Sequence, residues 1–321
     1  MIKNIAVVGC GHWGKNLVRN FAELGSLKAI CDPEESVAER FAKKFKVSNL
    51  SFNDILIDNS IEGVVLAVPA SIHAQLAIEV IKANKHVYVE KPLAMNKSEA
   101  DKMISLSKQH GVHLMVGHLL QYHPIFQKLK QLVQSNKLGS LSYMYSNRLS
   151  FGKVRSEEDV IWSFAPHDMS MLLSLAGKEP KSIITQSSKV LQKEIADTAI
   201  IHMAFDSKLK AHIHVSWIHP YKEHKLVICG DKAMAVFDDT KSWNEKLAIY
   251  EHKINFIGGD PSLTKADPKY IIVEQSEPLK NECQHFIDVV EGNSKPLTDG
   301  MEGLKVLNML TSASDSIGDL E

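Results

Sequence analysis

The stretch IAVVGCGHWG at residues 5–14 joins an apolar run to a glycine-rich turn, and a helical pattern follows it. In this GxGxxG pattern Gly9 permits a tight turn, Gly11 lets the backbone approach a pyrophosphate, and Gly14 lets the helix pack closely on the strand. Asp32 ends the next apolar run, where its carboxylate can accept hydrogen bonds from the adenosine ribose and repel a 2′-phosphate. The stretch therefore predicts a dinucleotide site that takes NAD rather than NADP.

Two other nucleotide-binding loops also use a glycine-rich turn. A P-loop needs Gly-Lys-Ser/Thr, whereas this loop continues as Gly14-Lys15-Asn16. A methyltransferase combines such a turn with an acidic residue after the second strand. Excluding it needs a second feature of the sequence.

The first third of the chain alternates apolar runs with amphipathic segments. The apolar runs are Ile5–Gly9, Leu27–Asp32, Gly63–Val68, His86–Glu90 and Val112–Gly117, and the helical patterns are Trp13–Leu24, Glu34–Phe45, His73–Ala83 and Lys97–Gln109. Runs rich in Val, Ile and Leu are typical of parallel strands covered on both faces. The alternation predicts an α/β fold, with a doubly wound parallel sheet of Rossmann type over residues 1–121.

The pattern changes after residue 121. Helical patterns lie at Pro124–Gln134, Pro166–Leu175, Leu279–Glu291 and Glu302–Ser312, and alternating strand patterns lie at Ala199–Phe205, Leu209–Trp217, His224–Gly230 and Ala233–Asp238. Alternation of apolar and polar residues indicates strands with one face exposed. Residues 122–321 are therefore predicted to form an α+β domain with an open-faced, mainly antiparallel sheet.

Composition narrows the class of protein. The 321 residues carry 37 Lys+Arg and 38 Asp+Glu, a net charge of −1, which argues against a nucleic-acid-binding protein that relies on bulk positive charge. The four cysteines are far apart and fit reduced thiols in the cytoplasm rather than a disulfide framework or a metal site. No apolar run approaches about 18 residues, so we expect a soluble cytoplasmic protein without a membrane span.

A second candidate element is Glu90-Lys91-Pro92, directly after the apolar run at 86–90. A lysine at the carboxyl end of a parallel strand points into the crevice where ligands bind in open α/β sheets. Pro92 rigidifies the chain after it. The alternative is an ordinary surface lysine.

With this element the sequence resembles the glucose-fructose oxidoreductase/inositol dehydrogenase/rhizopine-catabolism (Gfo/Idh/MocA) family, over nearly the whole chain. The resemblance rests on GCGHWG, AVPASIHAQLA, VEKPLA, VGH, WSFAPHDMSMLLSLAG and PLTDGMEGLKVLNML. The EKP element at this distance from the glycine loop argues against a methyltransferase. The family implies oxidation or reduction of a sugar or cyclitol carbon with a pyridine nucleotide. It also implies a homodimer or homotetramer formed through the C-terminal sheet.

The resemblance also assigns residues. Lys91 would contact the nicotinamide ribose and the reacting hydroxyl, and His167 would face it across the cleft as the second catalytic residue. His73 would lie at the lip of the cofactor site, with a helix-packing role as the alternative. The residues expected to bind the cofactor are Gly9, Gly11, His12, Trp13, Gly14, Asp32, Val68, Pro69, His73, Glu90 and Lys91.

The segment around His167 departs from the family. Ser163 and Ser170 stand where members usually carry aspartates, and Asp168 follows the histidine directly. Because proline favours the first helical position, we expect a helix that begins at Pro166 with His167 in its first turn. The helix dipole would then keep His167 neutral and able to take a proton, while Asp168 would complement the dipole.

The segments VGHLLQYHP and SNRLSFGKVRSEEDVIWSFAPHD most resemble a subgroup that acts on nucleotide-linked amino sugars. This implies oxidation of the C3 hydroxyl of a sugar such as UDP-N-acetylglucosamine to a ketone, a step toward a diamino-sugar lipid A in lipopolysaccharide synthesis. Guanidinium and ammonium groups suit a substrate diphosphate. The residues expected to bind substrate are Arg148, Lys153 and Arg155 at the diphosphate, Tyr122, His123 and Trp162 at the sugar, and Asp168.

Other interpretations stay open. One is oxidation of a free sugar or a cyclitol such as inositol, and another is an NAD-binding sensor that has lost turnover. His212 and His214 share a strand face and suggest a metal site, but no carboxylate or cysteine joins them at a recognisable spacing. We therefore interpret them as part of a sheet face or subunit interface and expect no metal.

Overall fold

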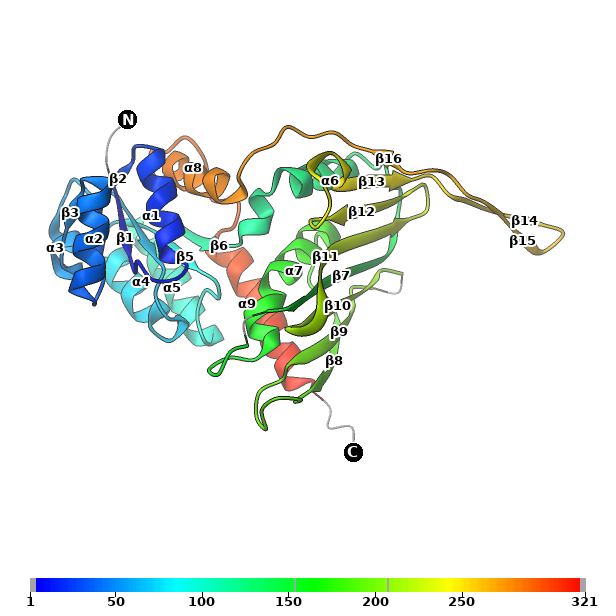
Figure 1. Cartoon of the computed structure of the whole chain (residues 1–321), viewed down its shortest axis with the longest axis horizontal. Helices are drawn as coiled ribbons and strands as arrows, with labels where there is room; N and C mark the ends of the chain where they lie inside the picture. The colour runs from blue at the N-terminus through cyan, green and yellow to red at the C-terminus, as the bar shows by residue number, and fades with distance from the viewer. Residues whose placement is uncertain (1–3, 153, 207, 318–321) are drawn as a thin grey trace. The chain divides into compact units, whose positions relative to one another are not determined.

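The computed structural model describes residues 4–152, 154–206 and 208–317, and it divides into two compact units (Figure 1). The first unit contains Met1–Tyr122 and Ser276–Asn308, and the second contains His123–Gln275 and Met309–Glu321. The predicted second domain, residues 122–321, therefore needs a correction, because residues 276–308 return to the first unit. The physical reason is packing, since helix α8 (Pro278–Val290) packs against helix α1 (Gly14–Glu23).

The first unit is built on six parallel strands in the order β3-β2-β1-β4-β5-β6. The strands are β1 (Ile5–Val8), β2 (Leu27–Cys31), β3 (Ser48–Asn49), β4 (Gly63–Leu66), β5 (His86–Glu90) and β6 (Leu114–Gly117). In a doubly wound sheet of this order, ligands bind beyond the carboxyl ends of the strands. The binding crevice lies between β1 and β4, because the connection after β1 runs toward one edge of the sheet and the connection after β4 runs toward the other. The predicted fold class is confirmed.

Helices cover both faces of this sheet. They are α1, α2 (Glu35–Phe45), α3 (Phe52–Ile57), α4 (His73–Lys82), α5 (Lys97–His110), α8, the start of α9 (Gly300–Asp315), and the short 3-10 helices η1 (Ala70–Ile72) and η2 (Leu119–Tyr122). On one face Ile5 and Val7 of β1 pack with Leu17 and Phe21 of α1 and Phe286 of α8 in one buried core. α4 and α5 pack against each other, and right-handed crossovers put them on the opposite face.

The second unit is built on an eight-stranded sheet in the order β16-β13-β12-β11-β7-β10-β9-β8, antiparallel except for the β7–β10 pair. The strands are β7 (Leu141–Phe151), β8 (Ser182–Ser188), β9 (Thr198–Ala204), β10 (Lys210–Ser216), β11 (Ile218–Gly230), β12 (Met234–Asp238), β13 (Leu247–Tyr250) and β16 (Lys269–Tyr270). The other elements are α6 (Pro124–Gln134), α7 (Val160–Ala176), η3 (Trp243–Glu245), the end of α9, and a separate pair, β14 (Lys253–Ile257) and β15 (Asp260–Thr264).

Burial alternates along the strands of this sheet. In β10, Ala211, Ile213 and Val215 are buried beneath α7, whereas His212 and His214 between them are partly exposed on the opposite face. This is the pattern of an antiparallel sheet with one covered and one open face. Within the ranges that the structure describes, no helix combines the length and apolar composition needed to cross a membrane.

A buried aspartate holds the loop that leads into β9. Both carboxylate oxygens of Asp197 accept hydrogen bonds, Oδ1 from Trp217 Nε1 at 2.6 Å and Oδ2 from the backbone nitrogens of Val190 at 2.8 Å and Leu191 at 2.7 Å. Burial alone would raise the pKa of Asp197, but these donors outweigh it and leave the pKa below its ordinary value. The ionised form therefore stabilises the fold.

We expect Asp197→Ala to lower the free energy of unfolding by about 3 kcal/mol at neutral pH, because the buried Trp217 indole and two backbone donors lose a charged acceptor. A carboxylate whose pKa is lowered by folding stabilises the native state fully above its unfolded pKa of about 3.9. This stabilisation is lost as the pH falls through the native pKa. The difference from wild type should therefore shrink below about pH 4 in urea titrations. Asp267→Ala, at an exposed position, is the control, and equal losses in the two variants would contradict this account.

Candidate active site

The glycine loop after β1 has a separate steric reason for each glycine. Gly9 has φ +92°, and a Cβ added there would lie 2.4 Å from the carbonyl oxygen of Ala67. A Cβ at Gly14 would lie 1.9 Å from the carbonyl oxygen of Gly9, so the start of α1 can pack on the strand only without a side chain. At Gly11, no described atom beyond its two chain neighbours lies within 4 Å of an added Cβ, so this backbone faces open space.

That space belongs to a cavity of about 670 Å³ in the first unit. Five predicted cofactor residues line it: Gly9, Gly11, Asp32, Val68 and Pro69. The open backbone at Gly11 lies just before α1, whose N-terminal end favours negative charge. Apolar walls with a carboxylate and a helix start suit the adenosine and pyrophosphate of NAD, so the residues present fit this cofactor.

The cavity also has lining residues that sequence reasoning missed. They are supplied mainly by the loops after β2 and around β3, including Pro33, Glu35, Asn49, Ser51 and Phe52. The two-residue strand β3 is too short to give a recognisable pattern. The sequence signal that could have revealed this region is the helix N-cap at Ser51. Its side chain accepts a hydrogen bond from the backbone nitrogen of Asp54 at the start of α3.

Asp32 also stabilises the loop. Its Oδ2 accepts a hydrogen bond from the backbone nitrogen of Cys10 at 2.6 Å, and its Oδ1 accepts one from that of Glu34 at 3.0 Å. Burial, aided by the Asp32 charge, raises the pKa of the Cys10 thiol to about 12, so Cys10 stays a neutral thiol. The same carboxylate is thus placed to fix the glycine loop and to form part of the cavity wall.

Trp13 connects the glycine loop to the EKP element. Its indole Nε1 donates a hydrogen bond to Glu90 Oε1 at 2.6 Å, and the hydroxyl of Tyr88 donates to the same oxygen at 3.1 Å. Burial raises the pKa of Glu90, although the donors and the charge of Lys91 oppose that effect. Trp13 and Glu90, both predicted to bind the cofactor, are therefore in contact with each other.

His73 holds the other side of the EKP element. It is buried at the start of α4, with Nδ1 2.8 Å from the carbonyl oxygen of Pro92 and Nε2 2.9 Å from that of Val68. Burial lowers the pKa of His73, and the Lys91 charge adds to this effect against the two carbonyl contacts. His73 therefore lies at the edge of the cofactor cavity, where it bridges Val68 and Pro92.

Lys91 lies between these two anchored neighbours. Glu90 is held by Trp13 and Tyr88, Pro92 is held by His73, and the Lys91–Pro92 peptide is cis. The charge of Lys91 acts on both Glu90 and His73. The chain around Lys91 is thus positioned by the elements that also shape the cavity.

The VGH motif has a partner that the sequence did not reveal. His118 is buried after β6, with Nδ1 2.6 Å from Glu302 Oε2 in the first turn of α9. Thr298, just before α9, donates its hydroxyl to the carbonyl of Val116 at 2.7 Å. These contacts fix the return of the chain to the first unit.

Helix α7 carries His167 but begins earlier than predicted. Asp159 is its N-cap and accepts a hydrogen bond from the backbone nitrogen of Trp162 at 2.9 Å, so the helix starts at Val160 and Pro166 lies inside it. His167 is therefore about two turns into the helix, beyond the reach of the N-terminal dipole. The prediction that a helix start at Pro166 acts on His167 is wrong.

Asp168 likewise does not complement a helix dipole. It is fully buried and accepts hydrogen bonds from Arg148 Nε at 2.6 Å and Nη2 at 3.2 Å, and from Ser146 Oγ at 2.6 Å. The guanidinium assigned to a substrate diphosphate is thus held by a carboxylate that joins α7 to β7. Contact of Arg148 or Asp168 with substrate stays a prediction.

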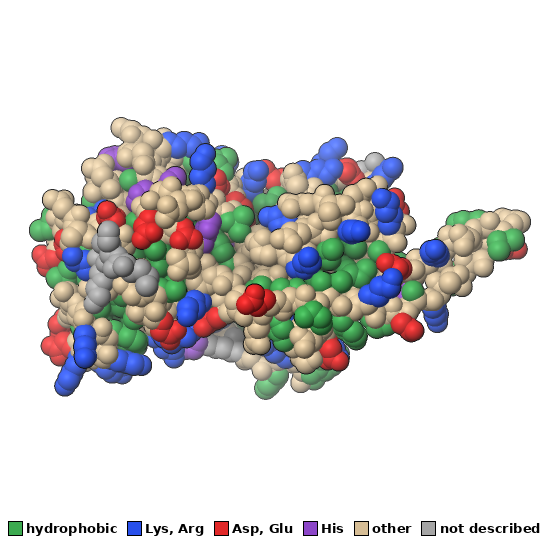
Figure 2. All heavy atoms as spheres, turned by 90° about the horizontal axis from the view of Figure 1, so that it is seen from above, with side chains coloured by type: hydrophobic (Ala, Val, Ile, Leu, Met, Phe, Trp, Pro, Cys, Tyr) green, Lys and Arg blue, Asp and Glu red, His purple; other side chains and the backbone are tan. Residues whose placement is uncertain are grey.

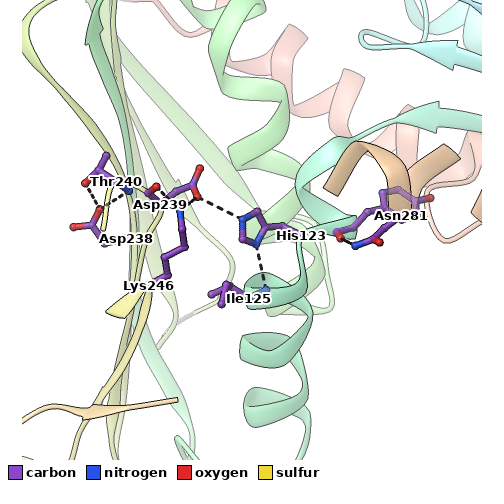
Figure 3. Close-up of polar contacts among 8 residues, drawn as sticks. His123, Ile125, Asp238, Asp239, Thr240, Lys246 and Asn281 are labelled. Atoms are coloured by element: carbon purple, nitrogen blue, oxygen red, sulfur yellow. Dashed lines mark hydrogen bonds and ion pairs between the residues drawn. The ribbon is translucent and has the colours of Figure 1, made fainter. Parts of the chain in front are cut away.

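Tyr122 and His123 also have internal partners. Tyr122 is buried in the core of the first unit, where its hydroxyl lies 2.9 Å from Thr298 Oγ1. His123 is the N-cap of α6 in the second unit, accepts a hydrogen bond from the backbone nitrogen of Ile125 through Nδ1, and faces Asp239 with Nε2 at 3.4 Å (Figure 3). Packing and capping thus occupy both side chains, and their place on a sugar-pocket wall stays a prediction.

Asp239 completes this contact. Burial alone would raise its pKa, but hydrogen bonds from His123 and Lys246 lower it below the ordinary value. The ring of His123 also stacks on Trp243, with centroids 5.7 Å apart. His123 therefore stabilises the junction of α6, β12 and η3.

Two of the remaining predicted substrate residues, Arg155 and Trp162, lie around the start of α7. Trp162 donates its indole hydrogen to Ser314 Oγ at 2.9 Å, and Arg155 Nε lies 3.7 Å from Glu158 Oε1. Lys153 lies outside the described residues. Ser163, His167 and Ser170 occupy positions i, i+4 and i+7 on one face of α7, so the two serines flank the histidine.

The predicted residues thus fall into two groups. The cofactor residues, with Lys91, belong to the first unit, and His167 and most substrate residues belong to the second. His12 is exposed on the glycine loop, and Gly14 is buried at the start of α1. The pairing of Lys91 with His167 stays a prediction.

Known proteins resemble the chain over nearly its whole length. It is 24% identical over 302 residues to the UDP-N-acetylglucosamine 3-dehydrogenase of Acidithiobacillus ferrooxidans, covering 94% of this chain and 93% of that protein. It is 25% identical over 329 residues to the myo-inositol 2-dehydrogenase of Thermotoga maritima, covering 98% and 96%.

Solved structures share the fold. The structure of the same Acidithiobacillus ferrooxidans enzyme gives a TM-score of 0.87 at 23% identity, covering 98% of this chain and 97% of that chain. The WlbA dehydrogenase from Bordetella pertussis, solved in complex with NADH and UDP-GlcNAcA, gives a TM-score of 0.81 at 20% identity, covering 98% and 94%.

Family models match both parts of the chain. Residues 3–118 match the oxidoreductase family with an NAD-binding Rossmann fold, and residues 126–236 match the GFO/IDH/MocA C-terminal domain. The cavity beside Gly11 and Asp32 lies within the first match. The chain therefore belongs to the GFO/IDH/MocA family and is an oxidoreductase with an NAD-binding Rossmann domain.

Proposed function

We propose that this oxidoreductase oxidises the C3 hydroxyl of a UDP-linked amino sugar, such as UDP-N-acetylglucosamine, to the 3-keto sugar. The observation that carries the proposal is likeness over at least 93% of each chain to two dehydrogenases whose names or bound ligands include UDP-linked N-acetylglucosamine sugars. A lysine whose chain neighbours are bound to Trp13 of the glycine loop and to His73 supports a dehydrogenase mechanism. In this proposal the product belongs to lipopolysaccharide (lipid A) synthesis.

The chain supplies positioning and proton transfer. NAD, when bound, provides the acceptor for the hydride that leaves the sugar carbon. The ammonium of Lys91 orients and polarises the reacting hydroxyl, and His167 takes its proton as the hydride leaves. Trp13 and His73 keep Lys91 in place through its two chain neighbours, Glu90 and Pro92.

A second candidate substrate is a free cyclitol or sugar. It is favoured by the likeness to the myo-inositol 2-dehydrogenase, which covers 98% of this chain. Such a substrate carries no diphosphate and needs no cluster of cations. Arg155 and Lys153, together with Arg148, are therefore the residues whose effect on binding separates the two candidates.

We further infer that the protein works in the cytoplasm as a homodimer or homotetramer formed through the open face of the C-terminal sheet. Separated cysteines support the reducing compartment, and burial raises the pKa of the thiols of Cys10 and Cys283. Partly exposed aromatic side chains on the open face, such as Tyr143 and Tyr145, support a subunit interface.

Asp32→Ser tests the cofactor preference. Removing the carboxylate from the cavity wall takes away the charge that repels a 2′-phosphate, so the ratio of kcat/KM for NADP to that for NAD should rise at least about tenfold. Glu34→Ser, which removes an exposed neighbouring charge, is the matched control and should leave the ratio unchanged. An unchanged ratio in Asp32→Ser would show that Asp32 does not select the cofactor.

The substrate is tested by NADH formation with UDP-N-acetylglucosamine, its uronic acid, free N-acetylglucosamine and myo-inositol. We expect turnover with a UDP-sugar, and a loss of about 10²–10⁴ in kcat for Lys91→Met and His167→Asn. Lys108→Met, an exposed lysine of α5, is the control for Lys91. Absence of NADH with every UDP-sugar would refute the substrate, and normal turnover in both variants would refute the catalytic pair.

A further inference from the structure

The hairpin formed by β14 and β15 is a separate two-stranded sheet in the second unit. Its strands pair from Lys253–Thr264 at the base to Ile257–Asp260 at the tip, and Gly258 and Gly259 make the turn with positive φ. The hairpin projects beyond the eight-stranded sheet of its own unit (Figure 1). It therefore gains no strand neighbours from that sheet.

One face of this hairpin is wholly apolar, whereas the other is polar except for Ile257 at the tip, which lies opposite Asp260. Ile254 lies opposite Leu263 and Phe256 lies opposite Pro261, so these four side chains share one face. On the other face Lys253 lies opposite Thr264 and Asn255 opposite Ser262. We call the first set the apolar face of the arm and the second set its polar face.

The apolar face is open to solvent. Ile254 is 57% exposed, Phe256 73% and Leu263 68%, and hydrophobic atoms are visible on the projecting hairpin (Figure 2). An isolated two-stranded hairpin is marginal in water, and an exposed apolar strand pair invites association. The amphipathic pattern thus indicates a surface that a partner covers.

A second apolar surface of the same unit also lacks a cover. On the open face of the eight-stranded sheet Ile184 is 62% exposed and Tyr143 38% exposed, and Tyr145 stacks on His212 beside them. The side chains that alternate with these, such as Met144 and Ile213, are buried on the other face. One chain therefore carries both an apolar arm and an open sheet face with exposed apolar and aromatic side chains.

We propose that β14–β15 is an intersubunit arm whose apolar face packs on the open sheet face of a second copy of this chain. A second copy is the one partner present whenever the chain is made, and it supplies a surface of matching character. In a two-fold symmetric dimer the arm of each copy packs on the open sheet face of the other, so each contact covers the apolar face of one arm and one open sheet face. The polar face of the arm, with Lys253 and Asn255, stays in water.

This inference rests on the proposed homo-oligomer and adds the element that holds it together. The four histidines and tyrosines of the receiving face, Tyr143, Tyr145, His212 and His202, offer flat rings to Ile254, Phe256 and Leu263. Burial lowers the pKa of His212, and the neighbouring His202 and His214 add to this, which favours the neutral form of the His212 ring that stacks on Tyr145.

The test compares two double variants of the hairpin, one with both substitutions on its apolar face and one with both on its polar face. Phe256→Ser/Leu263→Ser removes the apolar face, and Asn255→Ser/Thr264→Ser is the matched control on the polar face. Light scattering after size exclusion gives the mass, and sedimentation gives the dissociation constant. We expect wild type and control to exceed the single-chain mass of 35.8 kDa, and the apolar-face variant to dissociate at least tenfold more readily.

The outcomes separate the two proposals. A wild-type chain that is monomeric at every concentration overturns the homo-oligomer, whereas an oligomer that the apolar-face variant leaves intact overturns the arm alone. Because both substituted side chains are exposed, circular dichroism should show an unchanged fold. Ile184→Ser on the receiving face should also weaken association, and if it does not, the sheet is not the receiving surface.

Discussion

The hydrogen bond from the Trp13 indole to the Glu90 carboxylate is the contact on which the arrangement of the candidate active site depends. It joins the glycine loop to the strand end that precedes Lys91, and the hydroxyl of Tyr88 donates to the same carboxylate. His73 makes the matching connection from Val68 in the cavity wall to Pro92. The lysine thus lies between two neighbours whose positions are set by the cofactor-binding elements, and its placement follows from them.

Features encoded in short sequence windows were predictable. The runs at β1, β2 and β5 are apolar because parallel strands are buried on both faces, and helix α6 begins at Pro124 as proline at the first position indicates. The glycine loop and Asp32 were recognised because steric demands and charge act locally. The two-domain organisation followed from the change of period after residue 121, but the return of residues 276–308 did not.

Features that depend on distant partners were not predictable. Arg148 and Asp168 each carry a charge that fits a ligand equally well, and only the fold shows that they neutralise each other. His118 finds Glu302, which is 184 residues away, and no spacing rule predicts such a pair. At α7 two local signals competed, and the Asp159 cap prevailed over the start indicated by Pro166. Pro166 therefore lies inside the helix, where it cannot donate a backbone hydrogen bond to the preceding turn.

The most direct test of the coupling between cofactor loop and lysine is a double-mutant cycle with Trp13→Phe and Glu90→Leu, read as the dissociation constant of NAD measured by calorimetry. Phenylalanine removes the donor, and leucine removes the acceptor while keeping bulk. If the two side chains act through their hydrogen bond, the double variant should lose less than the sum of the single losses, with an interaction energy of about 1–2 kcal/mol. Single losses that add to within about 0.5 kcal/mol would contradict the account.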